Sequence, residues 1–152
     1  MNLFTESSDS PAGRAVLLSI KPRYADLILA GSKTVELRRS WPSNDIGVMV
    51  IYSSAPIQRL VGIAHVDRVE EADIGGLWKL SRENGGGVSH QELLDYFEGK
   101  KTAFGVMLKS VRVAHQAVDP NFIFPKFTPP QSFLYLDPRD LNRITQAMFP
   151  SE

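Results

Sequence analysis

The residues best suited to chemistry lie in one short segment, Ser19–Arg39, which reads SIKPRYADLILAGSKTVELRR. Within it, Lys33 is followed by Glu36 and then, two residues later, by Arg38. Because side chains alternate across a strand, Glu36 and Arg38 would share one face, with their bases roughly 6–7 Å apart. They could pair with each other or frame a ligand between them. The same alternation also fits an ordinary half-solvated strand, so the pattern alone indicates only a soluble α+β domain.

The neighbouring elements would present these side chains at a junction between a helix and a strand. An apolar run at 15–20 predicts a buried strand, and 22–30 has the apolar spacing of a short amphipathic helix that begins with proline. Gly31 would adopt the left-handed cap of this helix and allow a tight turn. That turn would present Lys33 at the start of a strand predicted over 34–38.

The rest of the chain predicts one α+β domain. Further strands are expected at 46–53, 60–69, 102–108 and 111–118, with an edge strand at 132–136. Residues 77–80 are expected to belong to a short helix. Two more helices are expected, one from the Ser89–Glu92 capping box to Gly99 and one from Asp137-Pro138 onward. Mostly sequential strands with three or four short helices favour a mixed or antiparallel sheet that closes into a barrel. We expect residues 1–13 to be a disordered tail and 14–152 to be a single domain.

The composition excludes some classes of chemistry. The 152 residues include no cysteine, so disulfides and cysteine metal sites are excluded and a reducing cytoplasm is expected. The three histidines have no metal-ligand spacing, and we predict no metal and no other cofactor. No apolar run reaches the roughly 20 residues that cross a bilayer, so no membrane partner is expected.

The charge balance gives little support for a nucleic-acid partner except at one place. Seventeen basic residues offset seventeen acidic ones, so a local patch would have to attract nucleic acid. The one local basic excess comprises Lys21, Arg23, Lys33, Arg38 and Arg39.

Three other features have less specific interpretations. Trp41, after the basic segment, could stack on a base or plug the end of a barrel. The triple glycine at 85–87 lacks the rest of a phosphate loop and predicts a flexible loop or a lid. The acidic cluster of Glu70, Glu71 and Asp73 predicts a solvated turn.

The segment G-S-K-T-V-E-L-R resembles the G-x-K-x-x-E-x-R signature of ASCH domains, a branch of the PUA-like superfamily. The resemblance extends from residue 15 to about 137. Tyr52-Ser53-Ser54-Ala55-Pro56, Trp78, the segment 96–99 and the segment 129–133 match, in order and spacing, one ASCH subgroup that is usually described as predicted transcriptional regulators.

The resemblance implies a small PUA-like mixed β-barrel of about six strands, with a cleft between the barrel and its helices. It also implies RNA or a modified nucleoside as the partner. Lys33 and Arg38 would then contact phosphate or carbonyl oxygens, and Glu36 would accept a hydrogen bond from an exocyclic base amine. Further nucleic-acid contacts are expected from Lys21, Arg23, Arg39, Trp41, Tyr52 and Ser53. We expect the protein to be a monomer.

Two enzymatic branches of the superfamily offer alternatives in the same cleft. One removes an acyl group from acetylated cytidine with a lysine, a threonine and a later glutamate. Lys33 matches the lysine, but Glu36 stands where that threonine would be, and Glu83 is a loose match to the later glutamate. A lysine nucleophile needs a lowered pKa, whereas we expect the close Glu36 to raise it.

The other branch consists of metal-independent ribonucleases that combine the signature lysine with a tyrosine and a serine. Lys33 again matches the lysine. The candidate hydroxyl groups are those of Tyr24, Tyr52, Ser53 and Ser132, and the sequence does not choose among them. Cleavage through the 2′-hydroxyl needs a base, an acid and charge stabilisation at phosphate.

Overall fold

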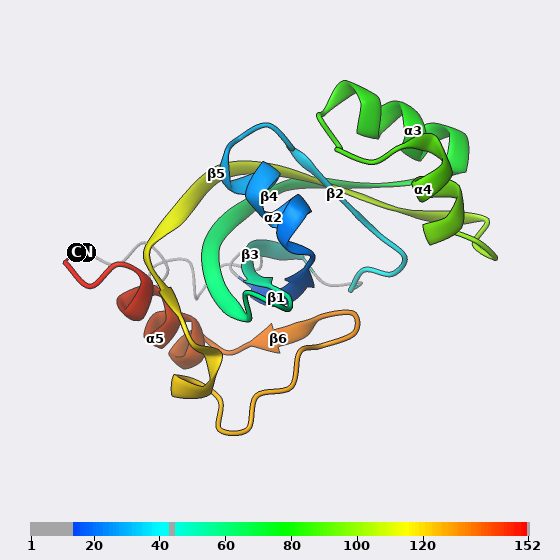
Figure 1. The fold of residues 1–152 in the computed structure, drawn as a ribbon. Helices are drawn as coiled ribbons and strands as arrows, with labels where there is room; N and C mark the ends of the chain where they lie inside the picture. The colour runs from blue at the N-terminus through cyan, green and yellow to red at the C-terminus, as the bar shows by residue number, and fades with distance from the viewer. Residues whose placement is uncertain (1–13, 43–44, 152) are drawn as a thin grey trace.

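The computed structural model describes residues 14–42 and 45–151, so the predicted tail at 1–13 lies outside the described residues. Figure 1 shows the elements. In chain order they are β1 (Arg14–Ile20), α2 (Pro22–Leu29), β2 (Val35–Arg38), β3 (Ile46–Ser53), β4 (Arg59–Asp73), α3 (Ile74–Glu83), α4 (His90–Tyr96), β5 (Thr102–Val118), the 3₁₀ turn η2 (Pro120–Phe122), β6 (Leu134–Leu136) and α5 (Pro138–Met148).

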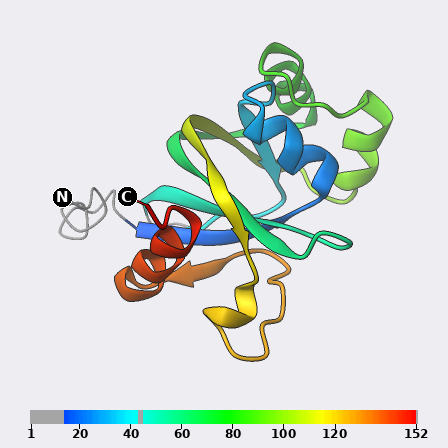
Figure 2. The same ribbon diagram turned by 60° about the vertical axis from the view of Figure 1, so that its left-hand side comes forward.

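The six strands form one mixed sheet with the order β2-β5-β4-β3-β1-β6. β1 and β3 run parallel, and the other neighbouring strands run antiparallel. The sheet is strongly curved, and the long β4 and β5 bend around it (Figures 1 and 2). This arrangement confirms the predicted α+β class with six strands and four helices.

A side chain connects the two outer strands of this sheet. Arg38, at the end of β2, donates from Nη2 to the backbone oxygen of Ser132, just before β6, at 2.7 Å. In the described part of the chain, the order β2-β5-β4-β3-β1-β6 leaves β2 and β6 as edges, so the curved sheet is tied together here by a guanidinium group.

The strand β1, which lies between β3 and β6, is buried on both faces, which explains its largely apolar sequence. Leu17 and its neighbours on one face belong to the apolar cluster covered by α5. Val16 and Leu18, on the other face, belong to the cluster covered by α2. A third cluster, centred on Leu77 and Phe97, lies between β2, β5 and the pair α3–α4. α5 and the α3–α4 pair thus lie at opposite ends of the molecule (Figure 1).

The predicted break between two strands at 109–110 is wrong, because β5 continues through it. Lys109 pairs with His65 and Arg112 pairs with Ile63, so β5 advances three residues where β4 advances two. Ser110 has a φ of 51° at this bulge. A bulge keeps the ladder going while it bends the strand, which the sequence pattern does not distinguish from a turn.

The predicted solvated turn at 70–73 is also wrong. Glu70 and Glu71 lie in the ladder opposite Gly105 and Phe104, so β4 extends to Asp73. Asp73 then caps α3 by accepting a hydrogen bond from the Gly76 N–H at 2.8 Å. The cap starts a helix of ten residues, longer than the predicted 77–80.

Within the described residues, no helix has the length and apolar character needed to span a membrane.

Candidate functional site

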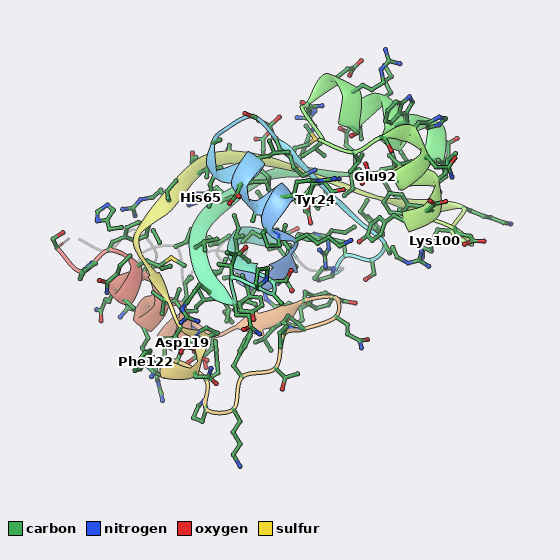
Figure 3. All side chains as sticks on the ribbon, viewed as in Figure 1. Tyr24, His65, Glu92, Lys100, Asp119 and Phe122 are labelled. Atoms are coloured by element: carbon green, nitrogen blue, oxygen red, sulfur yellow. The ribbon has the colours of Figure 1, made fainter. Side chains whose placement is uncertain are left out.

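A cleft of about 520 Å³ lies where the β1–α2 corner, β2 and α4 meet. This size falls in the range of small-ligand sites, roughly 300–1,000 Å³. Lys33, Glu36 and Arg38 all line it. Figure 3 shows Tyr24 and Glu92, which also line the cleft, near each other between α2 and α4. The structure therefore brings the three predicted signature side chains together.

A tight turn after α2 carries Lys33 into the cleft. Gly31 has a φ of 81°, the left-handed conformation predicted for it. The backbone N–H groups of Ser32 and Lys33 both donate to the oxygen of Leu27, at 3.0 and 3.1 Å. The side chain of Lys33 then points inward, so that the residue is only 2% exposed.

The ammonium group of Lys33 has one direct hydrogen-bond partner in the described structure. Its Nζ donates to the backbone oxygen of Gly86 at 2.6 Å. The same atom lies 5.3 Å from the centre of the Tyr24 ring, close enough for a cation–π contact. When charged, Lys33 thus keeps hydrogen-bond donors for a ligand.

Burial lowers the pKa of Lys33 below its ordinary value, and the nearby charge of Glu36 raises it by less. Burial disfavours the charged form of an amine, whereas a carboxylate favours it. Glu36 therefore raises the pKa of Lys33, as expected, but burial outweighs this effect and the net shift is downward. The sequence gives no sign of the burial, because the loop around Gly86 that covers Lys33 comes about fifty residues later.

Glu36 and Arg38 form a buried ion pair. Arg38 Nη1 lies 3.1 Å from Glu36 Oε2, and the side chains are 10% and 8% exposed. Arg38 is also held by Ser132, as described above. Among the described residues, the hydrogen bond given to the Glu36 carboxylate comes from Arg38 and goes to Oε2. Arg38 thus holds Glu36 in place and leaves one acceptor for a ligand.

Glu92 connects the two helical walls of the cleft. Its Oε2 lies 2.6 Å from Arg23 Nη2 and accepts from the Tyr24 hydroxyl at 3.2 Å. Its Oε1 accepts from the Ser89 N–H at 2.9 Å, which confirms the predicted capping box. The Ser89 N–H, followed by Arg23, lowers the pKa of Glu92 to about 2. Arg23 therefore acts through Glu92, which lines the cleft, rather than by lining it directly.

The predicted basic residues divide between the cleft and its surroundings. Lys21 lines the cleft from an exposed position before α2. Arg39 instead donates to the backbone oxygens of Tyr96 and Glu98, at 2.6 and 3.3 Å, and so supports the end of α4. Trp41 is partly buried against the α2-side core and does not line the cleft.

The candidate hydroxyl groups and the later glutamate are also dispersed. Tyr52 belongs to the α5-side core, where its ring lies 5.1 Å from that of Phe127. Ser53 is buried, and its Oγ has no partner among the described residues. Ser132 meets the site through its backbone oxygen alone, by the contact with Arg38. Glu83, at the end of α3, does not line the cleft.

The glycine loop at 85–87 packs closely against its surroundings, and its predicted flexibility stays a prediction. A Cβ on Gly85 would lie 1.9 Å from the oxygen of Ser32, and one on Gly86 would lie 1.8 Å from Ser81 Oγ. The glycines thus allow the close backbone approach that brings the Gly86 oxygen to Lys33.

The sequence reasoning missed the wall that α4 contributes. Glu92, Asp95 and Tyr96 line the cleft from this helix, and Gln131 lines it from the loop before β6. The capping box predicted the helix, but no local pattern shows which part of the fold a helix will cover.

The fold and the cleft define a small α+β domain with a buried Lys/Glu/Arg site, and the comparisons identify its family. The profile of the ASCH domain matches residues 18–111. An "ASCH domain-containing ribonuclease" of Zymomonas mobilis is 30% identical over 145 residues, which cover 90% of this chain and 94% of that protein. The chain belongs to the ASCH domain family.

Solved structures show the same fold. The crystal structure of ASCH from Zymomonas mobilis superposes with a TM-score of 0.80 at 26% identity, over 87% of this chain and 94% of that chain. The N-terminal domain of Staphylothermus marinus McrB superposes with a TM-score of 0.55 at 13% identity, over 91% and 94%. At that identity the second likeness concerns the fold alone.

Proposed function

We propose that this ASCH domain binds RNA or a modified nucleobase in the cleft of Lys33, Glu36 and Arg38. The observation that carries the proposal is the convergence of these three buried, charged side chains on one cleft of about 520 Å³. Charged groups are rarely buried without a partner or a role, because desolvation is costly. The relative from Zymomonas mobilis named a ribonuclease supports RNA as the class of ligand.

The contacts assign different roles to the three side chains. Lys33 has donors to spare for a base oxygen or ring nitrogen, and Glu36 has one free acceptor. Arg38 is engaged by Glu36 and by the backbone of Ser132, so its role is to position Glu36. Lys21, exposed at the edge of the cleft, suits a backbone phosphate of the bound strand.

Filter binding of single-stranded RNA to wild-type protein and to Lys33→Met tests the proposal. Methionine keeps the length of the side chain but removes its charge and its donors. We expect a salt-dependent affinity in the wild type and a loss of roughly 10- to 100-fold in the variant, the effect of one charged hydrogen bond. Lys109→Met is the matched control, because Lys109 is 56% exposed and does not line the cleft.

Thermal unfolding of each variant checks that it is folded before its binding is compared. Equal retention of RNA by the wild type and by a folded Lys33→Met protein would contradict a role for this cleft. Loss of retention in Lys109→Met as well would point to a general effect of charge.

Ribonuclease activity in the same cleft is the second candidate. It is favoured by the name of the curated relative and by the lowered pKa of Lys33. A neutral Lys33 amine could take the proton of a 2′-hydroxyl group, and Tyr24 and Tyr96, whose hydroxyl pKa values are raised mainly by burial, could supply a proton. Incubation with RNA in EDTA, followed by gel analysis, should then give product from the wild type and none from Lys33→Met. Equal cleavage by both would indicate a contaminating nuclease.

The amidohydrolase alternative has less support. The one candidate for its later glutamate, Glu83, lies outside the cleft lining. Mass spectrometry of acetylated cytidine after incubation with the wild-type protein tests it directly. A deacetylated product that depends on Lys33 would establish this activity.

Four finer assignments stay predictions. The relatives described above include none that is named a transcriptional regulator, so that subgroup rests on the sequence resemblance. A single domain over 14–152 that acts as a cytoplasmic monomer is likewise a proposal. Size-exclusion chromatography with light scattering would test the monomer.

A further inference from the structure

The side chains that line the cleft carry equal numbers of positive and negative charges. Its lining has three cationic side chains, those of Lys21, Lys33 and Arg38. It also has three carboxylates, those of Glu36, Glu92 and Asp95. A phosphate group inside the cleft would face carboxylates as well as cations, and two of these carboxylates, Glu36 and Glu92, are already paired with Arg38 and Arg23. The balance favours an uncharged group in the interior and leaves the phosphates of a bound strand at its mouth.

The rest of the lining is apolar. Ile20, Leu37, Leu93 and Phe97 line the cleft and are buried. Small-ligand sites commonly combine such an apolar surface with a few polar groups that fix the orientation of the ligand. Here the polar groups are the free oxygen of Glu36 and the Lys33 ammonium, and among the described residues no ion pair joins these two groups directly.

One aromatic ring is available to stack on a planar ligand. The ring of Tyr24 already contacts two cations, with Arg23 Cζ at 4.7 Å and Lys33 Nζ at 5.3 Å from its centre. Tyr96 also lines the cleft, is 45% exposed, and packs edge-on against Phe97 at 4.7 Å.

The charges of the Glu36–Arg38 ion pair act on the hydroxyl group of Tyr96. Burial is the largest cause that raises the pKa of this hydroxyl, and the charges of Arg38 and Glu36 act on it in opposite directions. Tyr96 lines the same cleft as Lys33 and Glu36, the polar groups that could orient a base, and it remains 45% exposed.

We propose that the cleft takes one unstacked nucleobase, that Tyr96 stacks on it, and that the site prefers bases with an exocyclic amine to uracil. This inference rests on the proposed function and specifies its ligand. Glu36 accepts from the amine, and Lys33 donates to the neighbouring ring nitrogen or carbonyl oxygen. In uracil a carbonyl oxygen replaces the amine and faces the Glu36 carboxylate.

Cytidine and uridine are the sharpest pair of probes, because they differ at the edge that Glu36 would contact. Ligand-observed NMR titration of the full chain gives the affinity for each nucleoside and for cytidine 5′-monophosphate. We expect cytidine to bind roughly 5- to 100-fold more tightly than uridine, the discrimination of one good polar contact. The 5′-phosphate should change the affinity for cytidine by about threefold at most, since it stays at the mouth of the cleft.

Variants of Tyr96 separate stacking from folding. Tyr96→Ala should weaken cytidine binding roughly 5- to 100-fold, the measured range for stacking of one base on an aromatic side chain. Tyr96→Phe keeps the ring and should keep most of the affinity. Phe122→Ala is the control, because Phe122 is 79% exposed and lies far from Tyr24 and Glu92 (Figure 3). Thermal unfolding confirms that each variant is folded.

Equal affinities for cytidine and uridine, or no effect of a folded Tyr96→Ala variant, would overturn the inference. If RNA is still retained in a Lys33-dependent way, the proposed function stands and only the one-base site fails. If neither RNA nor a nucleoside binds in a Lys33-dependent way, both fail.

Discussion

The burial of Lys33 predicts how the stability of this protein changes with pH. Burial lowers the pKa of Lys33 in the folded state, while the unfolded chain keeps the ordinary value of 10.5. Between the lowered value and 10.5, the unfolded state binds more protons than the folded state. The free energy of unfolding therefore rises with pH in that window, and the contribution is lost as pH falls through the folded-state pKa.

Replacement of Lys33 by methionine removes the contribution of Lys33 titration to the free energy of unfolding and leaves the other titrating groups in place. The difference in unfolding free energy, wild type minus Lys33→Met, should therefore increase as pH rises toward 10.5. One group that binds one proton less in the folded state gives a slope of at most about 1.4 kcal/mol per pH unit. The slope should vanish below the folded-state pKa, so its onset measures that value.

Urea unfolding of both proteins at pH 7, 8, 9 and 10 measures the difference, with Lys109→Met as a control for the loss of one positive charge. Lys109 is suitable because its side chain is 56% exposed. A difference that stays constant from pH 7 to 10 would refute the reasoning, because a Lys33 pKa raised above 10.5 by Glu36 would change the difference only above that pH. A difference that falls with rising pH would also refute it.

Two further predictions concern the elements around Lys33. Arg38→Met leaves the carboxylate of Glu36 buried and unpaired, so it should lower the free energy of unfolding in urea by about 3–5 kcal/mol. Glu36→Gln keeps an acceptor for Arg38 and should lower it by only about 1–2 kcal/mol. Equal losses in the two variants would contradict this account of the pair. Gly86→Ala should lower the free energy of unfolding by about 1–3 kcal/mol, because its Cβ would lie 1.8 Å from Ser81 Oγ. Gly75→Ala is the control: the atom nearest to its Cβ would be 3.7 Å away, so the change should stay within about 0.5 kcal/mol. A thermal shift of the same size in both glycine variants would count against the close packing of the loop.

The parts of this fold that local chemistry determines could be predicted from the sequence. The proline at the start of α2, the left-handed Gly31 and the alternation of β2 depend on neighbours within a few residues. They were sufficient to place Lys33 on a turn and Glu36 beside Arg38 on one strand. The Ser89–Glu92 capping box, which also involves residues three apart, was confirmed for the same reason.

The properties that depend on distant segments could not be predicted. The pKa of Lys33 is lowered mainly by burial, which involves the loop around Gly86, whereas the sequence indicated only the smaller, opposite effect of Glu36. Tyr96 and Glu92 line the cleft because α4 packs over it, and a capping box does not specify where its helix will dock. The bulge at Ser110 looks like a turn in the sequence because a polar pair interrupts an apolar pattern in both cases.

The contacts of Arg38 link the candidate site to the integrity of the sheet. One guanidinium group holds the acceptor Glu36 in place and connects β2 to the segment before β6. A substitution at Arg38 would therefore disturb ligand binding and the connection between the outer strands together, and a loss of function there would not identify a contact with the ligand. Tyr96 lines the cleft, is 45% exposed and is not part of that connection. For this reason, the role of the cleft in binding is better tested at Tyr96 than at the signature arginine.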